Sequence, residues 1–416
     1  MTRVTAEKSK DHSPYQVAPI VKQKEIFFMK IIYEQQTPGQ ALELYCDWIV
    51  EHLKKFEPPF EWYFLFYPIR TLLLGAKLLN RDDYAEAVWP WLDQYCIEQF
   101  PNGGLFSTCR GKAITEYTEE EIEHDIRTGR LNLADGGSNV HALFQAAICC
   151  KDPVRKQRYI DCGCKWLDCW VPIWSLPNGA YGNGIWNGHK ICEPYSMAMN
   201  VCSAFAGAYL ATGNKRYVRN AEGFAMWQCD NIHESGVPIR YNLYPPSNDS
   251  LIGDFSRIFY MMEAFCWVHH VSSDPEVRSR IEKMMKKWID ADIVTRWPDK
   301  LDWFDMNKAF LRVNRGEYKD SFDDKLRFYW FSSKCCGIPS LLQYYVDNMF
   351  DDAEIRKRCR QGALYLSNPL KARMLAVMAE DVVPDFCLQA TGFAGLTVAE
   401  GIQNGITFDI FGKAAE

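Results

Sequence analysis

Apolar and amphipathic segments alternate along the chain, and short polar turns join them in pairs. In the clearest pair, small and apolar residues recur at helical spacing over 197–212, and charged residues follow over 215–232. The first segment ends at Thr212-Gly213-Asn214, and a glycine at this place is typical of a helix C-terminus. The pattern predicts an apolar helix, a tight turn and an amphipathic helix that runs back beside it.

The same unit recurs along the sequence. Apolar segments are followed by amphipathic partners at 63–79 with 84–99, 138–150 with 155–170, 255–271 with 276–289, and 330–346 with 353–365. An amphipathic segment at 39–53 and an apolar segment at 386–402 are left over and should pair with each other. A helix packed on both sides is apolar nearly all round, whereas an outer helix has a polar stripe. The sequence therefore predicts an all-α protein, a six-hairpin (α/α) toroid closed by the two ends of the chain.

Composition narrows the class of protein. The chain has 416 residues and a formal net charge of −6, with the two signs interspersed. Without a basic block, nucleic acid is not an expected partner. No apolar run approaches the ~18 residues that span a bilayer, and the first residues lack the apolar core of a signal peptide, so no membrane partner is expected. We expect a flexible tail over 1–13 and a single toroid domain over 14–416.

The sixteen cysteines are spread through the predicted helices. In a chain of this length, that distribution is typical of buried thiols in a reducing compartment, so we expect a cytoplasmic protein. Cys162-Gly163-Cys164 has a metal-like spacing but no second pair at zinc distance. The sequence has no phosphate loop and no dinucleotide fingerprint, and we expect neither a metal nor a cofactor.

Long connections precede four of the predicted inner helices, at 103–137, 172–193, 235–254 and 296–327. Loops on one rim of a rigid scaffold are a usual place for a site. Three carboxylates, Asp135, Glu193 and Asp254, lie at or just before the starts of successive inner helices, about one hairpin period apart. A pair of carboxylates facing one cavity can hydrolyse a glycosidic or vinyl-ether bond. Each of the three could instead be an ordinary acid at a helix N-terminus.

Asp135 and Glu193 are the candidate catalytic pair. Glu193 follows a glycine-rich loop, and walls formed by Trp186 and Tyr195 would exclude water from it. Partial burial would favour the protonated form of Glu193 near neutral pH and make it the general acid. Asp135 would stay ionised and act as the base or orient the attacking water.

Candidate substrate-binding residues occur in the same segments. His141 and His189 lie near the two carboxylates in sequence and could relay protons. Arg257, on the same helical face as Asp254, could bind a substrate carboxylate or neutralise Asp254. The aromatic residues that could stack on a sugar ring or enclose an apolar ligand are Trp62, Trp186, Tyr195 and Trp303. Each of these residues could equally be an ordinary core residue.

The repeat resembles the six-hairpin (α/α) toroid enzymes and, among them, the unsaturated glucuronyl and rhamnogalacturonyl hydrolases. That family has one aspartate ahead of the second inner helix, where Asp135 lies, and another ahead of a Met- and Asn-rich third helix, similar to ICEPYSMAMN at 191–200 with Glu193. Its Ser-rich fifth inner helix is similar to 332–339, and the Arg of its Arg-Gly-Gln-Ala-Trp helix is kept as Arg257. The resemblance implies a hydrolase that adds water to a sugar acid, a small-molecule substrate, by acid–base catalysis.

A second resemblance competes with the first. The run Cys192-Glu193-Pro194, with Cys202 beyond it, is similar to a segment of the linalool dehydratase-isomerase family, which is also an (α/α) ring. That resemblance implies a hydro-lyase or isomerase that acts on an alkenol. A cysteine nucleophile here would require a histidine partner such as His189. A third hypothesis is a non-catalytic ring that binds a ligand, and the sequence leaves a homo-oligomer open.

Overall fold

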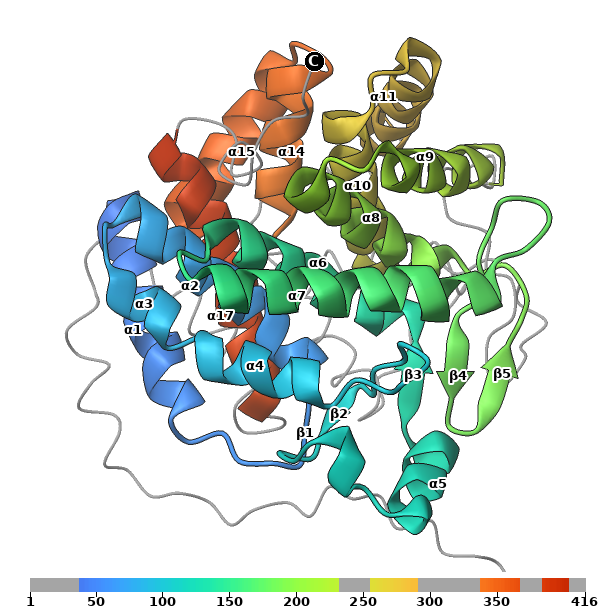
Figure 1. The fold of residues 1–416 in the computed structure, drawn as a ribbon. Coiled ribbons are helices and arrows are strands. Elements are labelled where there is room, and N and C mark those ends of the chain that lie inside the picture. The colour runs from blue at the N-terminus through green and yellow to red at the C-terminus, as the bar shows by residue number, and fades with distance from the viewer. Residues whose placement is uncertain (1–36, 232–254, 291–336, 367–383, 404–416) are drawn as a thin grey trace, which may run out of the picture.

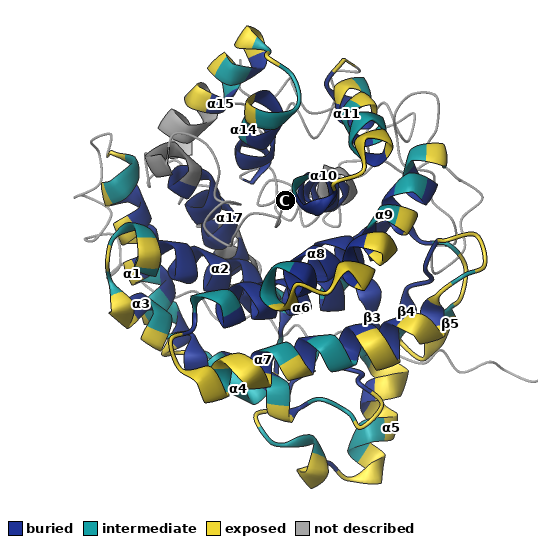
Figure 2. Cartoon of the chain, turned by 45° about the horizontal axis from the view of Figure 1, so that its top comes forward, coloured by how far each residue is buried: buried dark blue, intermediate teal, exposed yellow. Residues whose placement is uncertain are grey.

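Helices of two kinds, labelled in Figure 1, form two concentric walls around a common axis, which the turned view of Figure 2 shows. The structure, a computed structural model, describes residues 37–231, 255–290, 337–366 and 384–403. Within these ranges, six helices that are largely buried form the inner wall: α2 Tyr63–Leu78, α6 Leu133–Cys149, α8 Asn200–Thr212, α10 Phe255–Val271, α14 Ile338–Asn348 and α17 Pro384–Gln403. Each packs against the next in this order, and α17 packs against α2, so the inner wall closes on itself.

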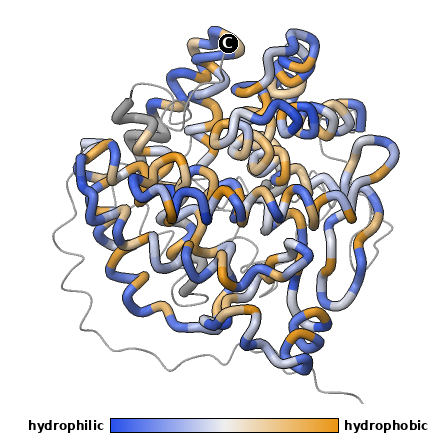
Figure 3. Tube along the Cα trace, viewed as in Figure 1, coloured by the Kyte–Doolittle hydropathy of each residue, from blue (hydrophilic) through white to orange (hydrophobic). Residues whose placement is uncertain are grey.

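The outer wall is made of the first helix that the structure describes and of the helices that follow α2, α6, α8, α10 and α14 along the chain. These are α1 Pro38–Leu53, α3 Asp82–Glu86 with α4 Trp89–Ile97, α7 Pro153–Lys165, α9 Lys215–Asp230, α11 Pro275–Asp290 and α15 Ala353–Leu366. Their exposed residues face outward, whereas the inner helices are buried (Figure 2). Hydrophilic and hydrophobic residues alternate along the outer helices, as expected for an amphipathic helix with one buried face (Figure 3). The predicted all-α toroid is therefore confirmed.

Some helix ends differ from the sequence prediction. The predicted segment 84–99 is split into α3 and α4, because Pro90 is accepted in the first turn of α4 but not inside a longer helix. The segment 155–170 leaves the α-helix after Lys165 and continues as a π-turn, Trp166–Trp170, and a 3-10 turn, Val171–Trp174. The helix α6 begins at Leu133, earlier than expected, and so places Asp135 in its first turn. The predicted tail at 1–13 lies outside the described residues.

Short strands and one further helix lie at one rim of the ring. Strands β1 Phe60–Glu61 and β2 Thr108–Cys109 pair antiparallel. Strands β3 Arg130–Asn132, β4 Gly184–Trp186 and β5 His189–Ile191 form an antiparallel sheet in that order. The acidic helix α5, Glu119–Thr128, projects from the ring ahead of β3 (Figure 1). Strands β2 to β5 lie within the predicted connections 103–137 and 172–193, for which no strand was expected, so the strands are an addition to the predicted fold.

The ring closes where α17, near the end of the chain, packs between α1 and α2. At this contact Gly392 lies against the backbone of α2, and a Cβ atom on Gly392 would stand 2.4 Å from the Pro68 nitrogen. The Thr71 hydroxyl of α2 donates a hydrogen bond to the Gly392 carbonyl at 2.7 Å. The two helices can approach this closely only because Gly392 has no side chain. The leftover helices of the sequence therefore pair as predicted.

Gly392→Ala is expected to destabilise the protein by about 1–3 kcal/mol, because the added methyl group meets backbone atoms that cannot move aside. The matched control is Gly223→Ala on the outer helix α9, where an added Cβ has no atom within 4 Å. That substitution should be neutral or stabilise by up to ~1 kcal/mol, since alanine favours a helix. Chemical denaturation of the three proteins measures both effects. Equal stability of Gly392→Ala and the wild type would refute the close contact.

Candidate functional site

The N-terminal ends of the inner helices face one rim, because an outer helix runs back between each inner helix and the next one along the chain. At this rim Asn132 caps α6 and fixes Asp135. The Asn132 side chain accepts a hydrogen bond from the Asp135 backbone N–H at 2.6 Å and donates one to the Asp135 carboxylate at 2.8 Å. The Asp135 side chain keeps 18% of its surface exposed. It is therefore held in one orientation and remains open to a ligand.

The β4–β5 hairpin is bound to the start of α6. The Asn183 carbonyl accepts a hydrogen bond from the Leu133 N–H at 3.1 Å, and its side-chain oxygen accepts one from the Ala134 N–H at 3.0 Å. The two turn residues, Asn187 and Gly188, have φ values of 49° and 77°. Asn-Gly at these positions is the preferred turn of a two-residue hairpin. This backbone carries Trp186 to the position opposite Arg130 in the sheet.

Arg130 connects the carboxylate to two aromatic rings. Its guanidinium carbon lies 4.5 Å from the centre of the Trp186 ring and 5.7 Å from the centre of the Tyr63 ring. Its Nη1 atom lies 3.6 Å from the Asp135 carboxylate. We call Asp135, Arg130, Trp186 and Tyr63 the rim cluster. A carboxylate, a cation and aromatic faces on neighbouring elements form a surface that suits a polar, ring-shaped ligand.

The enclosure expected around Glu193 is not found. Glu193, Cys192 and His189 are all exposed, since they lie on or just after the outer strand β5. Tyr195, in contrast, is 5% exposed, and its hydroxyl donates to the Met197 sulfur at 3.7 Å. Tyr195 is therefore part of the core and forms no wall around Glu193. The reason is local: β5 ends at Ile191, and the chain enters the interior only two residues after Glu193.

Cys202 does not share the environment of Cys192. Cys202 is fully buried in α8, and its thiol donates to the Ala221 carbonyl of α9 at 3.6 Å. Burial raises the pKa of this thiol. A thiolate at Cys202 is therefore strongly disfavoured, and the two cysteines do not form one reactive pair.

Two further candidates prove to be buried. Trp62 is fully buried and donates its indole N–H to the Glu98 carboxylate at 3.2 Å. Glu98 also accepts the backbone N–H of Gly111 at 2.9 Å and so fixes the β1–β2 region. The role of Trp62 as a stacking residue is therefore corrected to a structural role. Its indole needs a buried partner, and the Glu98 carboxylate supplies it.

His141 is the second buried candidate, with 1% of its surface exposed. Its Nδ1 lies 2.6 Å from the Ser203 carbonyl, and its Nε2 lies 2.9 Å from the Gln145 amide nitrogen. Burial, assisted by the positive charge of Arg70, holds the pKa of His141 well below its usual range. The ring therefore joins α6 to α8 as a neutral group and does not relay protons at the rim.

Two other candidates, Asp254 and Trp303, lie outside the described residues. Arg257 lies in the first turn of α10, but its side chain is also outside the part of the chain that the structure describes. Of the residues predicted from the sequence, Asp135 and Trp186 both contact Arg130. His189 lies in strand β5 of the same sheet, and Glu193 lies two residues beyond that strand.

A polar cluster inside the ring was missed by the sequence analysis. The Tyr67 hydroxyl donates to the Glu263 carboxylate at 2.7 Å, and Arg70 Nη1 lies 2.5 Å from the other carboxylate oxygen. The Arg70 and Glu263 side chains are only 7% and 6% exposed. Burial, followed by the Glu263 charge, raises the pKa of Tyr67. A signal existed, since Arg70 and Glu263 each lie in the middle of a largely apolar helix, and such charges are rarely buried without a partner.

We call Tyr67, Arg70 and Glu263 the axial cluster. Two of its residues lie on the same face of helix α2 as Tyr63 of the rim cluster. Tyr63, Tyr67 and Arg70 are spaced four and three residues apart on α2, so their side chains lie on one face. Tyr63 contacts Arg130 at the rim, and Arg70 pairs with Glu263 in the interior. One face of α2 therefore leads from the rim cluster to the axis of the ring.

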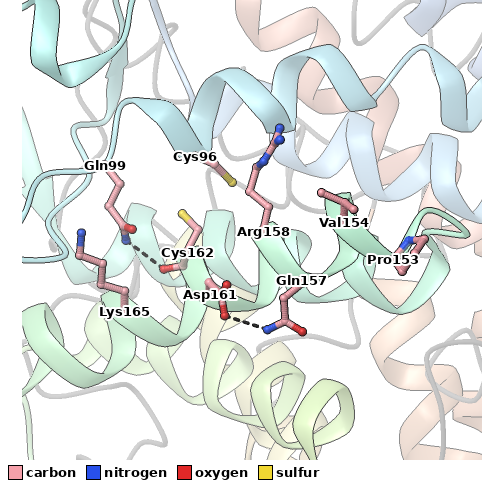
Figure 4. A pocket seen from close by; sticks show the side chains of 9 residues that line it. All are labelled: Cys96, Gln99, Pro153, Val154, Gln157, Arg158, Asp161, Cys162 and Lys165. Atoms are coloured by element: carbon pink, nitrogen blue, oxygen red, sulfur yellow. Dashed lines mark hydrogen bonds between the residues drawn. The ribbon is translucent and has the colours of Figure 1, made fainter.

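The described residues include no group of three or more His, Cys, Asp or Glu that could hold a metal ion. Within the same ranges, no helix is both long enough and apolar enough to cross a membrane. A cleft of about 670 Å³ lies on the outer wall between α4 and α7, and none of the rim residues line it (Figure 4).

The fold has relatives among enzymes of known structure. The sequence matches no protein-family model and no curated protein. An α-1,6-mannanase of glycoside hydrolase family 76 from Salegentibacter sp. HEL1_6 superimposes with a TM-score of 0.51 at 10% identity, over 88% of this chain and 99% of that one. A polysaccharide lyase superimposes with a TM-score of 0.53 at 11% identity, over 89% of this chain and 99% of that one. An inactive variant of the mannanase is known in complex with α-1,6-mannotetrose.

The buried histidine predicts a pH dependence of stability. Below about pH 6.5 the unfolded chain protonates His141 but the folded protein does not, so stability falls as the pH decreases. One such group contributes at most about 1.4 kcal/mol per pH unit. Burial also lowers the pKa of His269, which should add a similar dependence. Denaturant unfolding between pH 5 and 7 measures the combined effect of the two histidines on the free energy of unfolding.

His141→Gln should lower the slope of the free energy of unfolding against pH by the contribution of one titrating group. Glutamine can still donate a hydrogen bond to the Ser203 carbonyl, but it does not titrate. The control is His124→Gln, a change of an exposed histidine on α5. If His141→Gln keeps the full slope of the wild type, the neutral buried state of His141 is wrong.

Proposed function

We propose that this chain is an enzyme that acts on carbohydrate at the rim cluster. The observation that carries the proposal is the contact of one Arg130 guanidinium with the Trp186 ring, the Tyr63 ring and the Asp135 carboxylate. The fold relatives support it, since one hydrolyses a mannan and the other cleaves a polysaccharide. In this proposal, the helical ring is the scaffold and its rim carries the chemistry.

Within this class, we propose a sugar acid as the substrate and hydrolysis of the unsaturated uronyl type as the reaction. A sugar ring would stack on Trp186, and its carboxylate would accept the donors of Arg130. Arg130 would then release Asp135 from its ion pair, leaving that carboxylate to act on the glycosidic or vinyl-ether bond. The ion pair is partly exposed and therefore weak, so a substrate can displace it at small cost.

Glu193 remains the proposed second carboxylate. It lies two residues beyond β5, and Ile191 is aligned with Gly184 and Asn132 across the sheet, so Glu193 follows the sheet at the same end as the start of α6 with Asp135. Glu263 offers the alternative position, inside the ring, but both of its carboxylate oxygens are already engaged by Tyr67 and Arg70. We therefore assign the acid role to Glu193 and a positioning role to Glu263.

A second candidate function is a hydro-lyase or isomerase acting on an alkenol. The observation in its favour is the group of packed aromatic rings beside the axial cluster, where Tyr67 lies 4.1 Å from Phe393 and 6.0 Å from Phe259, measured between ring centres. Aromatic surroundings of this kind suit an apolar alcohol better than a sugar. The buried Cys202 weighs against the cysteine chemistry that the resemblance implied.

Asp135→Asn should lower turnover by ~10²–10⁴-fold, since it removes a positioned acid–base group. The assay is a panel of unsaturated uronides, α-1,6-linked mannosides, aryl glycosides and allylic alcohols, read by mass spectrometry for gain or loss of water. Glu193→Gln should cause a loss of similar size. The control is Asp161→Asn, on the exposed side of α7. Wild-type turnover in Asp135→Asn would exclude this carboxylate from the reaction.

Arg130→Gln should weaken binding of acidic sugars by ~10–100-fold, because a charge-assisted hydrogen bond contributes about 1.5–3 kcal/mol. Neutral sugars should lose much less, so KM for the acidic and neutral members of the panel separates the two cases. The control is Arg216→Gln on the outer wall, where Arg216 pairs with Asp168. An equal loss for both sugar classes would contradict recognition of a carboxylate by Arg130.

A further inference from the structure

Two cysteines from different outer helices face each other in the cleft between α4 and α7. Cys96 of α4 and Cys162 of α7 both line this cleft, and their sulfur atoms point towards one another (Figure 4). Cys162 is 6% exposed, and Cys96 is half-buried. The two residues are separated along the sequence by the whole of α5, β3 and α6. Their contact is therefore made by the tertiary fold and is not a consequence of sequence proximity.

The backbone around the two thiols is fixed. The Gln99 side-chain amide donates to the Cys162 carbonyl at 2.9 Å and to the Gly103 carbonyl at 3.1 Å. Gly103, with φ at 87°, lies so close to α7 that a Cβ would stand 2.6 Å from the Lys165 carbonyl. These contacts join the end of α4 to α7 beside the cysteines. The thiols are therefore held at a short separation without a covalent bond.

The electrostatic environment supports direct contact of the two thiols. The hydrogen bond with Cys162, followed by burial, raises the pKa of Cys96 well above its usual range. The positive charge of Arg158, which also lines the cleft, lowers the pKa of Cys96 and so opposes these two effects. Cys96 is therefore mostly a thiol at neutral pH, and its reaction with an oxidant is slow compared with that of an activated cysteine.

We propose that Cys96 and Cys162 form a disulfide when the protein meets a hydroperoxide. One thiolate attacks the peroxide oxygen, which gives a sulfenic acid and releases water or an alcohol. The second thiol then attacks the sulfenic sulfur, the S–S bond forms, and the hydroxyl leaves as water. Two thiols lose two hydrogen atoms in total, and the hydroperoxide is reduced. This inference is independent of the proposed function.

The cross-link would act on the segment that carries two residues of the rim cluster, Arg130 and Asp135. Residues 97–161 lie between the two cysteines and include β3 with Arg130 and the start of α6 with Asp135. A disulfide that closes a loop of this length restricts the unfolded chain strongly. The oxidised protein should therefore unfold at a higher temperature than the reduced protein, by about 5 °C for a chain of this size.

The test is peptide mapping of the full chain after treatment with hydrogen peroxide and alkylation of the remaining thiols. We expect one cross-linked peptide pair containing Cys96 and Cys162, which disappears on reduction. Cys96→Ser and Cys162→Ser should each abolish this pair and the rise in melting temperature. The matched control, Cys149→Ser, replaces another partly buried cysteine and should leave both unchanged.

Two outcomes would overturn the proposal. One is a map in which Cys96 and Cys162 stay reduced or are oxidised separately to sulfinic acids. The other is a cross-link between different cysteines while these two remain alkylated. The mapping uses the wild-type protein, so the test holds even if a serine variant does not fold. The outcome is also separate from any loss of turnover in the Asp135 variant.

Discussion

The ring depends on one close contact between helices, where α17 lies against α2 with Gly392 at the point of contact. In a closed ring every inner helix is held by its two neighbours, so a gap at one interface would loosen all of them. The helices at this interface come from opposite ends of the described chain, and the Thr71 hydrogen bond to the Gly392 carbonyl adds a polar link between them. The closing contact therefore sets the orientation of α2 within the inner wall.

The orientation of α2 determines what the ring presents at its rim and along its axis. One face of α2 places Tyr63 in contact with Arg130 and places Arg70 in an ion pair with Glu263 of α10. Because α10 is three positions away from α2 around a ring of six, this ion pair joins opposite sides of the inner wall. A buried charge is costly unless it is paired and hydrogen-bonded, and the Tyr67 hydroxyl supplies the additional bond to Glu263. The interior of the ring is therefore polar at Arg70 and Glu263 and aromatic at the rings packed around Tyr67.

The repeat of apolar and amphipathic segments was enough to predict the hairpins, and the two leftover segments predicted how the ring closes. Those features follow from the spacing of apolar residues, which distinguishes a helix packed on both sides from a helix packed on one side. The β3–β4–β5 sheet did not appear in that pattern, although Asn187-Gly188 was a usable hairpin signal. Missing the hairpin also meant missing Arg130, because only strand pairing brings it to Trp186.

Side-chain exposure was the less predictable part of the site. Trp62 and His141 were read as ligand-facing from their neighbours in sequence, and both are buried with their own hydrogen-bond partners. Glu193 was read as enclosed, and it lies on an exposed connection after β5. Asp135 was predicted near the start of an inner helix, and it lies in the first turn of α6 because that place depends on the repeat. The repeat predicts where a residue lies in the ring, but it does not predict which side chains the packed helices bury, as His141 of α6 shows.

The central claim is that the rim cluster is the place where a carbohydrate binds. A crystal structure of Asp135→Asn with an oligosaccharide substrate identified from the panel tests it most directly. The account predicts electron density for a sugar ring stacked on Trp186, with a polar group of the sugar within hydrogen-bond distance of Arg130. A sugar bound only elsewhere, such as in the cleft between α4 and α7, would contradict it.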